Sequence, residues 1–156
     1  MKTAFGILAL LLLASTAQAQ TGACPTGSAL TIIPTGGTIN ACLIPDLDPA
    51  LGHNAVDSAN RPVVVRYDVL LFNDGDPVTA TPVATINIGK PTLNAQNVGW
   101  VVIPNAQVPV NVRLRSSAVA IGQDGAVSGR APLSANPFVL APVALTPRAP
   151  GGLRVP

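Results

Sequence analysis

The chain is poor in charge and in the side chains that usually carry catalysis. Only 10% of its 156 residues are charged, glutamate is absent, and His53 is the single histidine. The formal net charge of +2 gives no strongly basic character, so we expect neither nucleic acid nor an anionic membrane as a partner. Two cysteines and one histidine are too few ligands for a structural zinc site. We therefore predict no metal site and no cofactor.

Long hydrophobic runs are also absent, except at the start of the chain. Met1 and Lys2 precede the apolar run "FGILALLLLA" (5–14), and "AQA" (17–19) is the small-residue pattern that signal peptidase accepts. The run is too short for a membrane span, which takes about 20 apolar residues. We predict a signal peptide over 1–19 and no transmembrane segment in the mature chain. The protein is then secreted, with the periplasm or the cell surface as alternatives.

The two cysteines, Cys24 and Cys42, are expected to form a disulfide bond, because an exported chain meets an oxidising compartment. A second interpretation makes Cys24 the lipidated cysteine of a lipoprotein, since "TGAC" (21–24) places small residues before it. Thr21 stands where such sites carry an aliphatic residue, and the apolar run has already ended at Ala14. The disulfide is the favoured interpretation.

The remaining sequence has the alternation of β-strands. Helical periodicity is absent after the leader, whereas Pro and Gly, 16 and 14 residues respectively, punctuate short runs rich in Val, Ile and Thr. Pro82 lies inside one run, which marks it as an edge strand or two short pieces. Seven strands are predicted, at 28–33, 38–44, 62–72, 78–89, 98–103, 108–117 and 136–142.

Alternation also predicts which side chains are buried. One face of the third run carries Val65, Tyr67, Val69 and Leu71, and one face of the sixth carries Val108, Val110, Val112 and Leu114. Seven such strands predict an all-β fold, a seven-stranded antiparallel sandwich of two sheets over residues 20–142. The expected core includes Tyr67, Val69, Trp100, Val112 and Leu114. The Pro/Gly-rich end, 143–156, is predicted to be a tail.

One stretch identifies a family resemblance. "NVRLRSSAVAIGQDGAVSGRAPLSANPF" (111–138) resembles the last third of a fibronectin type III domain, with alternating arginines, a Gly-containing turn, Ser-Gly-x-x-x-x-Ser and a closing strand. "VVVRYDVLLFNDGD" (63–76) resembles the third strand of that domain and its turn. The resemblance covers about residues 60–142. Val108 or Val110 stands where the family usually has a tyrosine, and the second strand has no tryptophan, so another immunoglobulin-like sandwich stays open.

Candidate catalytic groups are few. His53 lies in a polar loop near Asp57 and Ser58, but neighbours in one loop rarely form a catalytic triad, and an ordinary solvated histidine is the favoured interpretation. Asp46 with Asp48, and Asp74 with Asp76, stand two apart at predicted turns. Aspartate favours turns because it caps its own backbone, and a weak calcium site is the alternative. We predict no catalytic residue.

A candidate binding surface follows from the resemblance. The third and penultimate strands of a fibronectin type III sandwich are neighbours, which would bring Arg66, Arg113 and Arg115 into a basic stripe near Asp68. Such a stripe would suit an acidic polysaccharide or protein partner. The simpler interpretation is that these arginines are solubilising charges that pair with aspartate.

Three classes of function are compatible with the sequence. The first is a secreted, non-enzymatic sandwich module with a binding, adhesion or structural role and an unidentified protein or polysaccharide partner. The second is a subunit of a surface or extracellular assembly that pairs edge strands, as pilus-type sandwiches do. The third is a small secreted hydrolase, ranked last because catalytic groups are so few.

Overall fold

The computed structural model describes residues 23–25, 28–35, 38–104 and 107–141. The predicted signal peptide, 1–19, and the predicted tail, 143–156, lie outside these residues. Within the described part of the chain, no helix is long and apolar enough to cross a membrane.

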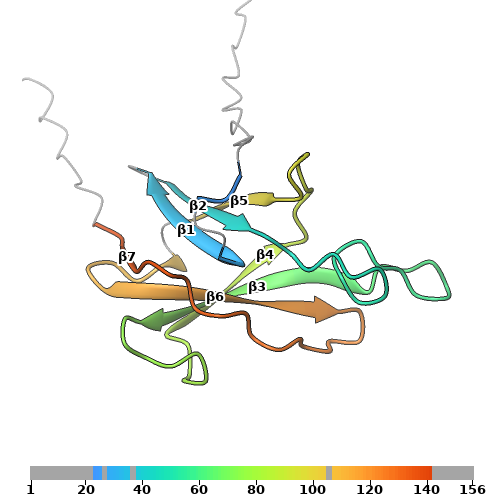
Figure 1. Cartoon of the computed structure of the whole chain (residues 1–156). Coiled ribbons are helices and arrows are strands. Elements are labelled where there is room, and N and C mark those ends of the chain that lie inside the picture. The colour runs from blue at the N-terminus through green and yellow to red at the C-terminus, as the bar shows by residue number, and fades with distance from the viewer. Residues whose placement is uncertain (1–22, 26–27, 36–37, 105–106, 142–156) are drawn as a thin grey trace, which may run out of the picture.

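The fold is a sandwich of two antiparallel sheets, as predicted (Figure 1). One sheet has the order β1-β2-β5 and the other the order β4-β3-β6-β7. All seven predicted strands are present, although their limits differ. The strands are β1 (Leu30–Thr35), β2 (Thr38–Leu43), β3 (Val64–Asn73), β4 (Ala84–Gly89), β5 (Gly99–Ile103), β6 (Arg113–Gly122) and β7 (Phe138–Val139).

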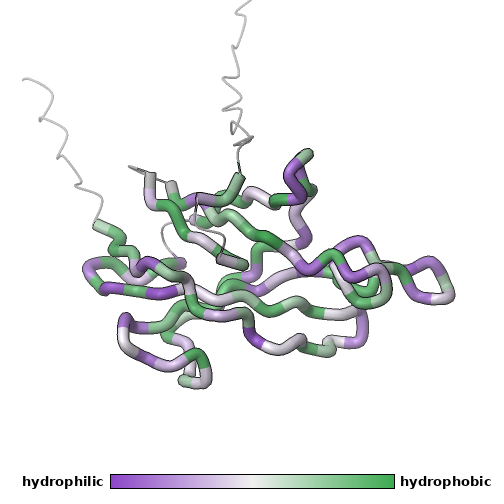
Figure 2. The backbone as a smooth tube through the Cα atoms, viewed as in Figure 1, coloured by the Kyte–Doolittle hydropathy of each residue, from purple (hydrophilic) through white to green (hydrophobic). Residues whose placement is uncertain are grey.

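The main core lies between the two sheets and consists of side chains from alternate strand positions. In Figure 2 the strands are largely hydrophobic, and hydrophilic residues gather mostly in the connecting loops. Tyr67, Val69 and Leu114 are buried in this core as predicted, and Val112 packs against it half-buried. Trp100 was expected inside, but that prediction is wrong. It lies opposite Cys42, on the outer face of its sheet, because Ala41 and Leu43 on either side of Cys42 point into the core.

The structure departs from the predicted alternation of buried and exposed side chains at two places. A β-bulge between Val64 and Arg66 brings Val64 into the core and leaves Val65 half-buried. Asn111 has a φ of 57°, so the extended conformation is interrupted there and β6 begins only at Arg113. Val110 is consequently 46% exposed. The alternation therefore fails wherever the backbone leaves the extended region.

A second, smaller apolar cluster lies on the outer face of the four-stranded sheet. Leu70 and Phe72 of β3 meet Val119 and Ile121 of β6, and Ala80 and Leu133 from the flanking loops pack against them. The guanidinium group of Arg130 lies 5.6 Å from the Phe72 ring centroid and donates hydrogen bonds to the carbonyl oxygens of Val78 and Ala80. Arg130 thus ties the two covering loops together across this face.

The Ser-Gly-x-x-x-x-Ser segment extends the sheet beyond β6 without forming a regular strand. The backbone N–H groups of Ser128 and Ser134 donate to the carbonyl oxygens of Ala120 and Ser116. In return, the two serine hydroxyls accept hydrogen bonds from the N–H groups of the same two residues, at 2.9 and 3.1 Å. Side-chain oxygens therefore replace two carbonyls of a β-ladder. The regular strand β7 is correspondingly short.

The predicted disulfide joins Cys24 to Cys42, which are 18 residues apart, and Cys42 is fully buried. Replacement of both cysteines by serine should lower the free energy of unfolding by about 3 kcal/mol, the chain-entropy value for a loop of this length. Urea unfolding of the two proteins, followed by circular dichroism, measures the difference. Dithiothreitol should destabilise the native protein and leave the double variant unchanged; equal sensitivity of both proteins to the reductant would contradict the prediction.

Candidate binding site at the loop end of the sandwich

Three connections meet at one end of the sandwich: 44–63 between β2 and β3, 90–98 between β4 and β5, and the turn that follows β6 (Figure 1). The first is longer than the roughly 12–15 residues above which unstructured loops become uncommon in compact domains. In sandwiches of this architecture, loops that gather at one end are a frequent place for recognition. The loop end is therefore the candidate site.

The 44–63 loop is held in one shape by its own hydrogen bonds. The carboxylate of Asp48 accepts from the N–H groups of Ala50 and Leu51, and that of Asp46 accepts from the N–H of Asp48. The backbone also closes on itself, since the N–H of Gly52 donates to the Asp48 carbonyl at 2.8 Å. Asp46 and Asp48 therefore act as turn residues, as expected from their spacing.

His53 anchors this loop to the sandwich. It is buried, and its Nδ1 lies 3.0 Å from the hydroxyl of Tyr67 on β3, with the two rings stacked at a centroid distance of 5.7 Å. Burial, with a smaller contribution from the charge of Lys90, lowers the pKa of His53, while a hydrogen bond with the Pro91 backbone opposes this effect. Burial, assisted by the charge of Asp46, raises the pKa of Tyr67 to about 12. The prediction of a solvated His53 is therefore wrong: the loop folds back and buries the ring.

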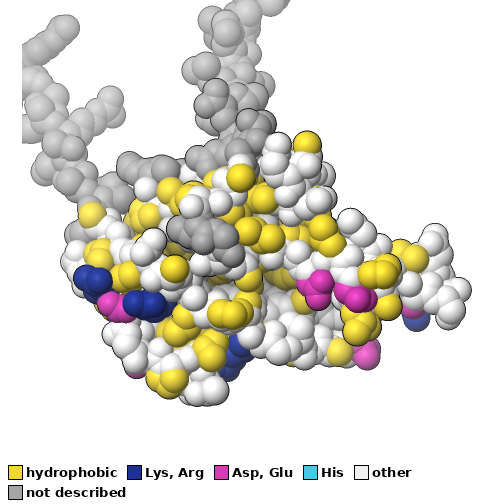
Figure 3. Space-filling view, viewed as in Figure 1, with side chains coloured by type: hydrophobic (Ala, Val, Ile, Leu, Met, Phe, Trp, Pro, Cys, Tyr) yellow, Lys and Arg dark blue, Asp and Glu magenta, His cyan; other side chains and the backbone are white. Residues whose placement is uncertain are grey.

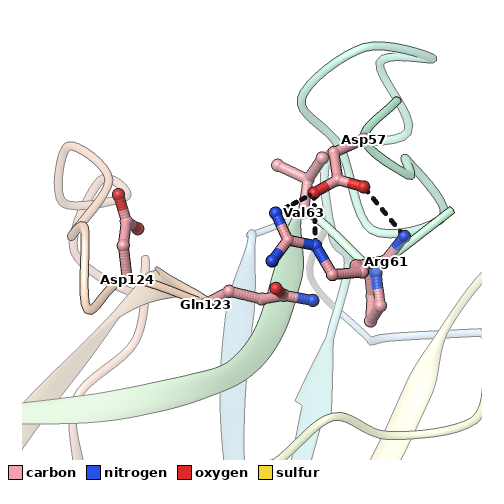
Figure 4. Close-up of a pocket in the computed structure, with 6 residues that line it drawn as sticks. Asp57, Arg61, Val63, Gln123 and Asp124 are labelled. Atoms are coloured by element: carbon pink, nitrogen blue, oxygen red, sulfur yellow. Dashed lines mark hydrogen bonds and ion pairs between the residues drawn. The ribbon is translucent and has the colours of Figure 1, made fainter. Parts of the chain in front are cut away.

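The structure does not bring His53 together with Asp57, its neighbour in the sequence. The carboxylate of Asp57 binds Arg61 through the guanidinium group, at 2.7 and 2.8 Å, and also accepts from the Arg61 backbone N–H. Those hydrogen bonds lower the pKa of Asp57. This pair, Gln123 and Asp124 line a hollow of about 370 Å³. Figure 4 shows the pair on one side of it and Asp124 on the other. The pair shapes the tip of the loop.

A larger cleft opens between the two sheets beside the same loop. Its volume is about 480 Å³, within the range of pockets that bind small ligands or side chains. Leu43, Val64 and Ala118 form part of its apolar lining, and Leu51 and the His53–Tyr67 pair stand beside them. The lining is mainly apolar, so this cleft suits an apolar group better than a charged one.

Exposed aliphatic side chains stand on the same loop. Leu47, Leu51 and Val56 are 43%, 73% and 52% exposed. Figure 3 shows a face dominated by hydrophobic and uncharged side chains, on which the charged ones form small separate groups. A long loop held rigid by polar contacts thus presents aliphatic side chains to solvent. Composition alone did not reveal them, because nothing in the sequence tells which of the loop's apolar residues face outward.

The three arginines of the predicted basic stripe are not together. Arg113 and Arg115 both bind Asp74, at 2.6 and 2.7 Å, at the end of the sandwich opposite the candidate site. Hydrogen bonds from Arg115 and Arg113 lower the pKa of Asp74. Arg66 instead binds Asp68, at 3.2 Å. Arg115 pairs with Phe72, which is six residues from Arg66 along β3, so the two groups of arginines are separated by about 20 Å.

The other acidic pair, Asp74 and Asp76, is also engaged within the protein. Asp76 accepts a hydrogen bond from the Asn73 side chain, and Asp74 is bound by the two arginines. Within the described residues, no three histidine, cysteine or aspartate side chains come close enough together to hold a metal ion.

No protein-family model, curated protein or solved structure matches this chain. The candidate site is therefore defined by its own geometry.

Acidification should destabilise the protein through His53. Because its pKa is lower in the folded state, the unfolded chain binds more protons below the ordinary histidine pKa of about 6.5, and stability falls as the pH decreases through this range. Asp57 and Asp74, whose pKa values are lowered too, act only below about pH 4. Urea unfolding between pH 7.5 and 5 should show the loss in the native protein and a flat profile in His53→Gln. A native profile that is flat as well would refute the assignment.

The 44–63 loop should depend on the absence of a side chain at Gly52. A Cβ there would lie 2.6 Å from the Asp48 carbonyl oxygen and 2.7 Å from that of Asp46. We expect Gly52→Ala to lower the free energy of unfolding by about 1–3 kcal/mol and to shift the amide resonances of the loop. Gly129→Ala, where a Cβ meets nothing within 4 Å, is the matched control and should change stability by less than about 0.5 kcal/mol. Similar effects of both substitutions would argue against a rigid loop.

Proposed function

We propose that this protein is an exported, non-enzymatic sandwich module of the fibronectin type III kind that binds a partner protein through its loop end. The leader-like segment 1–19 supports export, and the Cys24–Cys42 disulfide suits an oxidising compartment. The observation that carries the proposal is the rigid 44–63 loop, which exposes Leu47, Leu51 and Val56, with Leu51 lining a mainly apolar cleft.

The strand order supports the kind of sandwich proposed. In an immunoglobulin constant domain, the fourth strand lies in the sheet of the first, second and fifth strands. Here β4 pairs with β3 instead, and β3 pairs with β6, the neighbours that the fibronectin type III resemblance implies. The tyrosine that the family places in its penultimate strand has no counterpart in β6, whereas Tyr67 of β3 fixes a loop through His53.

A protein partner fits the site better than a polysaccharide does. The exposed anchors of the loop are aliphatic, and an aliphatic surface gains from the burial of apolar area on contact with another protein. The two rings that anchor the loop, His53 and Tyr67, are buried against each other. They are not arranged as an open platform on which a sugar ring could stack.

The geometry of His53 favours binding over hydrolysis. A general base needs a ring nitrogen directed at a nucleophile, with a third group orienting the ring. Nδ1 of His53 contacts the Tyr67 hydroxyl, the ring also has a hydrogen bond with the Pro91 backbone, and Asp57 is bound to Arg61. These contacts support a structural role for the histidine.

The proposal predicts that a partner contacts residue 51. A photo-crosslinking amino acid placed at Leu51 of the exported protein should label one discrete protein in the producing cells, because this side chain is 73% exposed at the cleft. The matched position is Val110, which is 46% exposed outside the loop and should give no such product.

In the same experiment, Leu47→Asp should reduce the yield of the product from position 51 by about tenfold, the effect of losing roughly 1.4 kcal/mol at an interface. Identical labelling from positions 51 and 110, or no effect of Leu47→Asp, would refute a loop-end site. Mass spectrometry of the exported protein would also show whether it begins at Gln20, as the proposed processing requires.

A further inference from the structure

We propose that the outer edge of β4 is a self-association site, at which the edge of a second copy of this chain pairs antiparallel. The resulting dimer has one continuous eight-stranded sheet across a two-fold axis. This inference is independent of the loop-end site, which lies at the end of the sandwich and not along its side.

β4 is a terminal strand of the four-stranded sheet, and among the described strands it pairs with β3 alone. Every second backbone N–H and C=O of such a strand points away from the sheet and can hydrogen-bond another strand. This edge can therefore form backbone hydrogen bonds with an extended segment of another chain.

The regular part of β4 also lacks the charges and prolines that normally block edge pairing. Natural edge strands carry charged residues or proline, or are very short or covered. No charged residue occurs between Asp76 and Lys90, and β4 itself contains no proline. A β-bulge does occur where Tyr67 and Asp68 face Gly89 and Asn87, which leaves residues 84–87 as the regular part of the edge.

The other edges are better protected. Pro34 lies within β1. The segment 91–98 returns to β5 through a bridge between Leu93 and Gly99, which covers part of that strand's outer side. β7 has only two residues, Phe138 and Val139. β4 is therefore the longest uncharged and proline-free edge among the described strands.

An antiparallel pair about one residue keeps each side chain on its own face, so a second copy of β4 matches this edge. A two-fold axis through Ile86 uses the regular part of both edges, with Thr85 facing Asn87 of the other copy, and Ala84 lies towards Ile88 at the bulge. Ala84, Ile86 and Ile88 all pack on the core side, whereas Thr85 and Asn87 are on the exposed side. Apolar residues thus meet apolar residues on one face, and polar residues meet polar ones on the other.

The register gives a charge test with matched variants. T85R/N87R places like charges opposite each other in the dimer, so it should raise the dimer dissociation constant by about tenfold or more. T85R/N87D changes the same two positions but pairs opposite charges across the axis, so it should restore association. V139R, on the other edge of the same sheet, should leave association unchanged, since Val139 is already 50% exposed.

Sedimentation equilibrium of the exported protein from 10 µM to 1 mM measures the dimer. This range covers the weak affinity that we expect of an interface of about 1,200 Å² or less. Amide hydrogen exchange at both concentrations should show slower exchange in residues 84–87 at the higher one. A monomer throughout, or loss of the dimer in V139R but not in T85R/N87R, would overturn the proposal. Failure of T85R/N87D to associate would overturn the register. None of these outcomes affects the crosslinking expected at Leu51.

Discussion

The pairing of β3 with β6 is the interaction on which the rest of the structure depends. These two ten-residue strands form the middle of the four-stranded sheet and pair along almost their whole length. Their side chains alternate between two apolar clusters: Val69, Leu71 and Leu114 face the other sheet, whereas Phe72 and Val119 face the covering loops. Because both faces are buried in the middle of the pair, apolar residues run continuously over 69–72 of β3 and 118–121 of β6, as in a central strand that has no solvated side. A slip by one residue would exchange the two clusters.

Burial of both faces also decides where the protein can meet other molecules. A solvated outer face would have allowed a stripe of arginines along β3 and β6. Instead, the loops tied by Arg130 cover the middle of that face, and Arg66 remains at one end with Arg113 and Arg115 at the other. Each of these three arginines has an aspartate partner, which leaves little net charge for an anionic ligand. What remains for recognition is the loop end, with its exposed aliphatic side chains, and the edges of the sheets.

The sequence predicted the fold well because the β-signal is repeated in seven separate segments, each bounded by Pro, Gly, Asn or Asp. The predicted pattern of buried side chains failed where the backbone departs locally from a regular strand. The left-handed Asn111 and the bulge beside Val64 shift the alternation by local geometry that composition does not encode, and Trp100 is turned outward by the register of β5 with β2. The candidate site was harder still. His53 was expected in solvent because its neighbours in the sequence are polar, yet its partners, Tyr67 and the Pro91 backbone, come from β3 and the loop after β4. Contacts between segments this far apart follow from the assembled sandwich and not from the loop's own residues.

The composition of the 44–63 loop bears on whether its exposed aliphatic residues serve in binding. A loop that served only to cross from one sheet to the other could be short, since most connections in compact domains have about 4–6 residues. This one contains a small interior of Gly52, His53 and Ala55, held by aspartate and backbone hydrogen bonds. Leu47, Leu51 and Val56 do not contribute to that interior. The loop is therefore stabilised by its polar residues, while three of its aliphatic side chains face water. Such an arrangement is expected when the exposed side chains are buried by a partner.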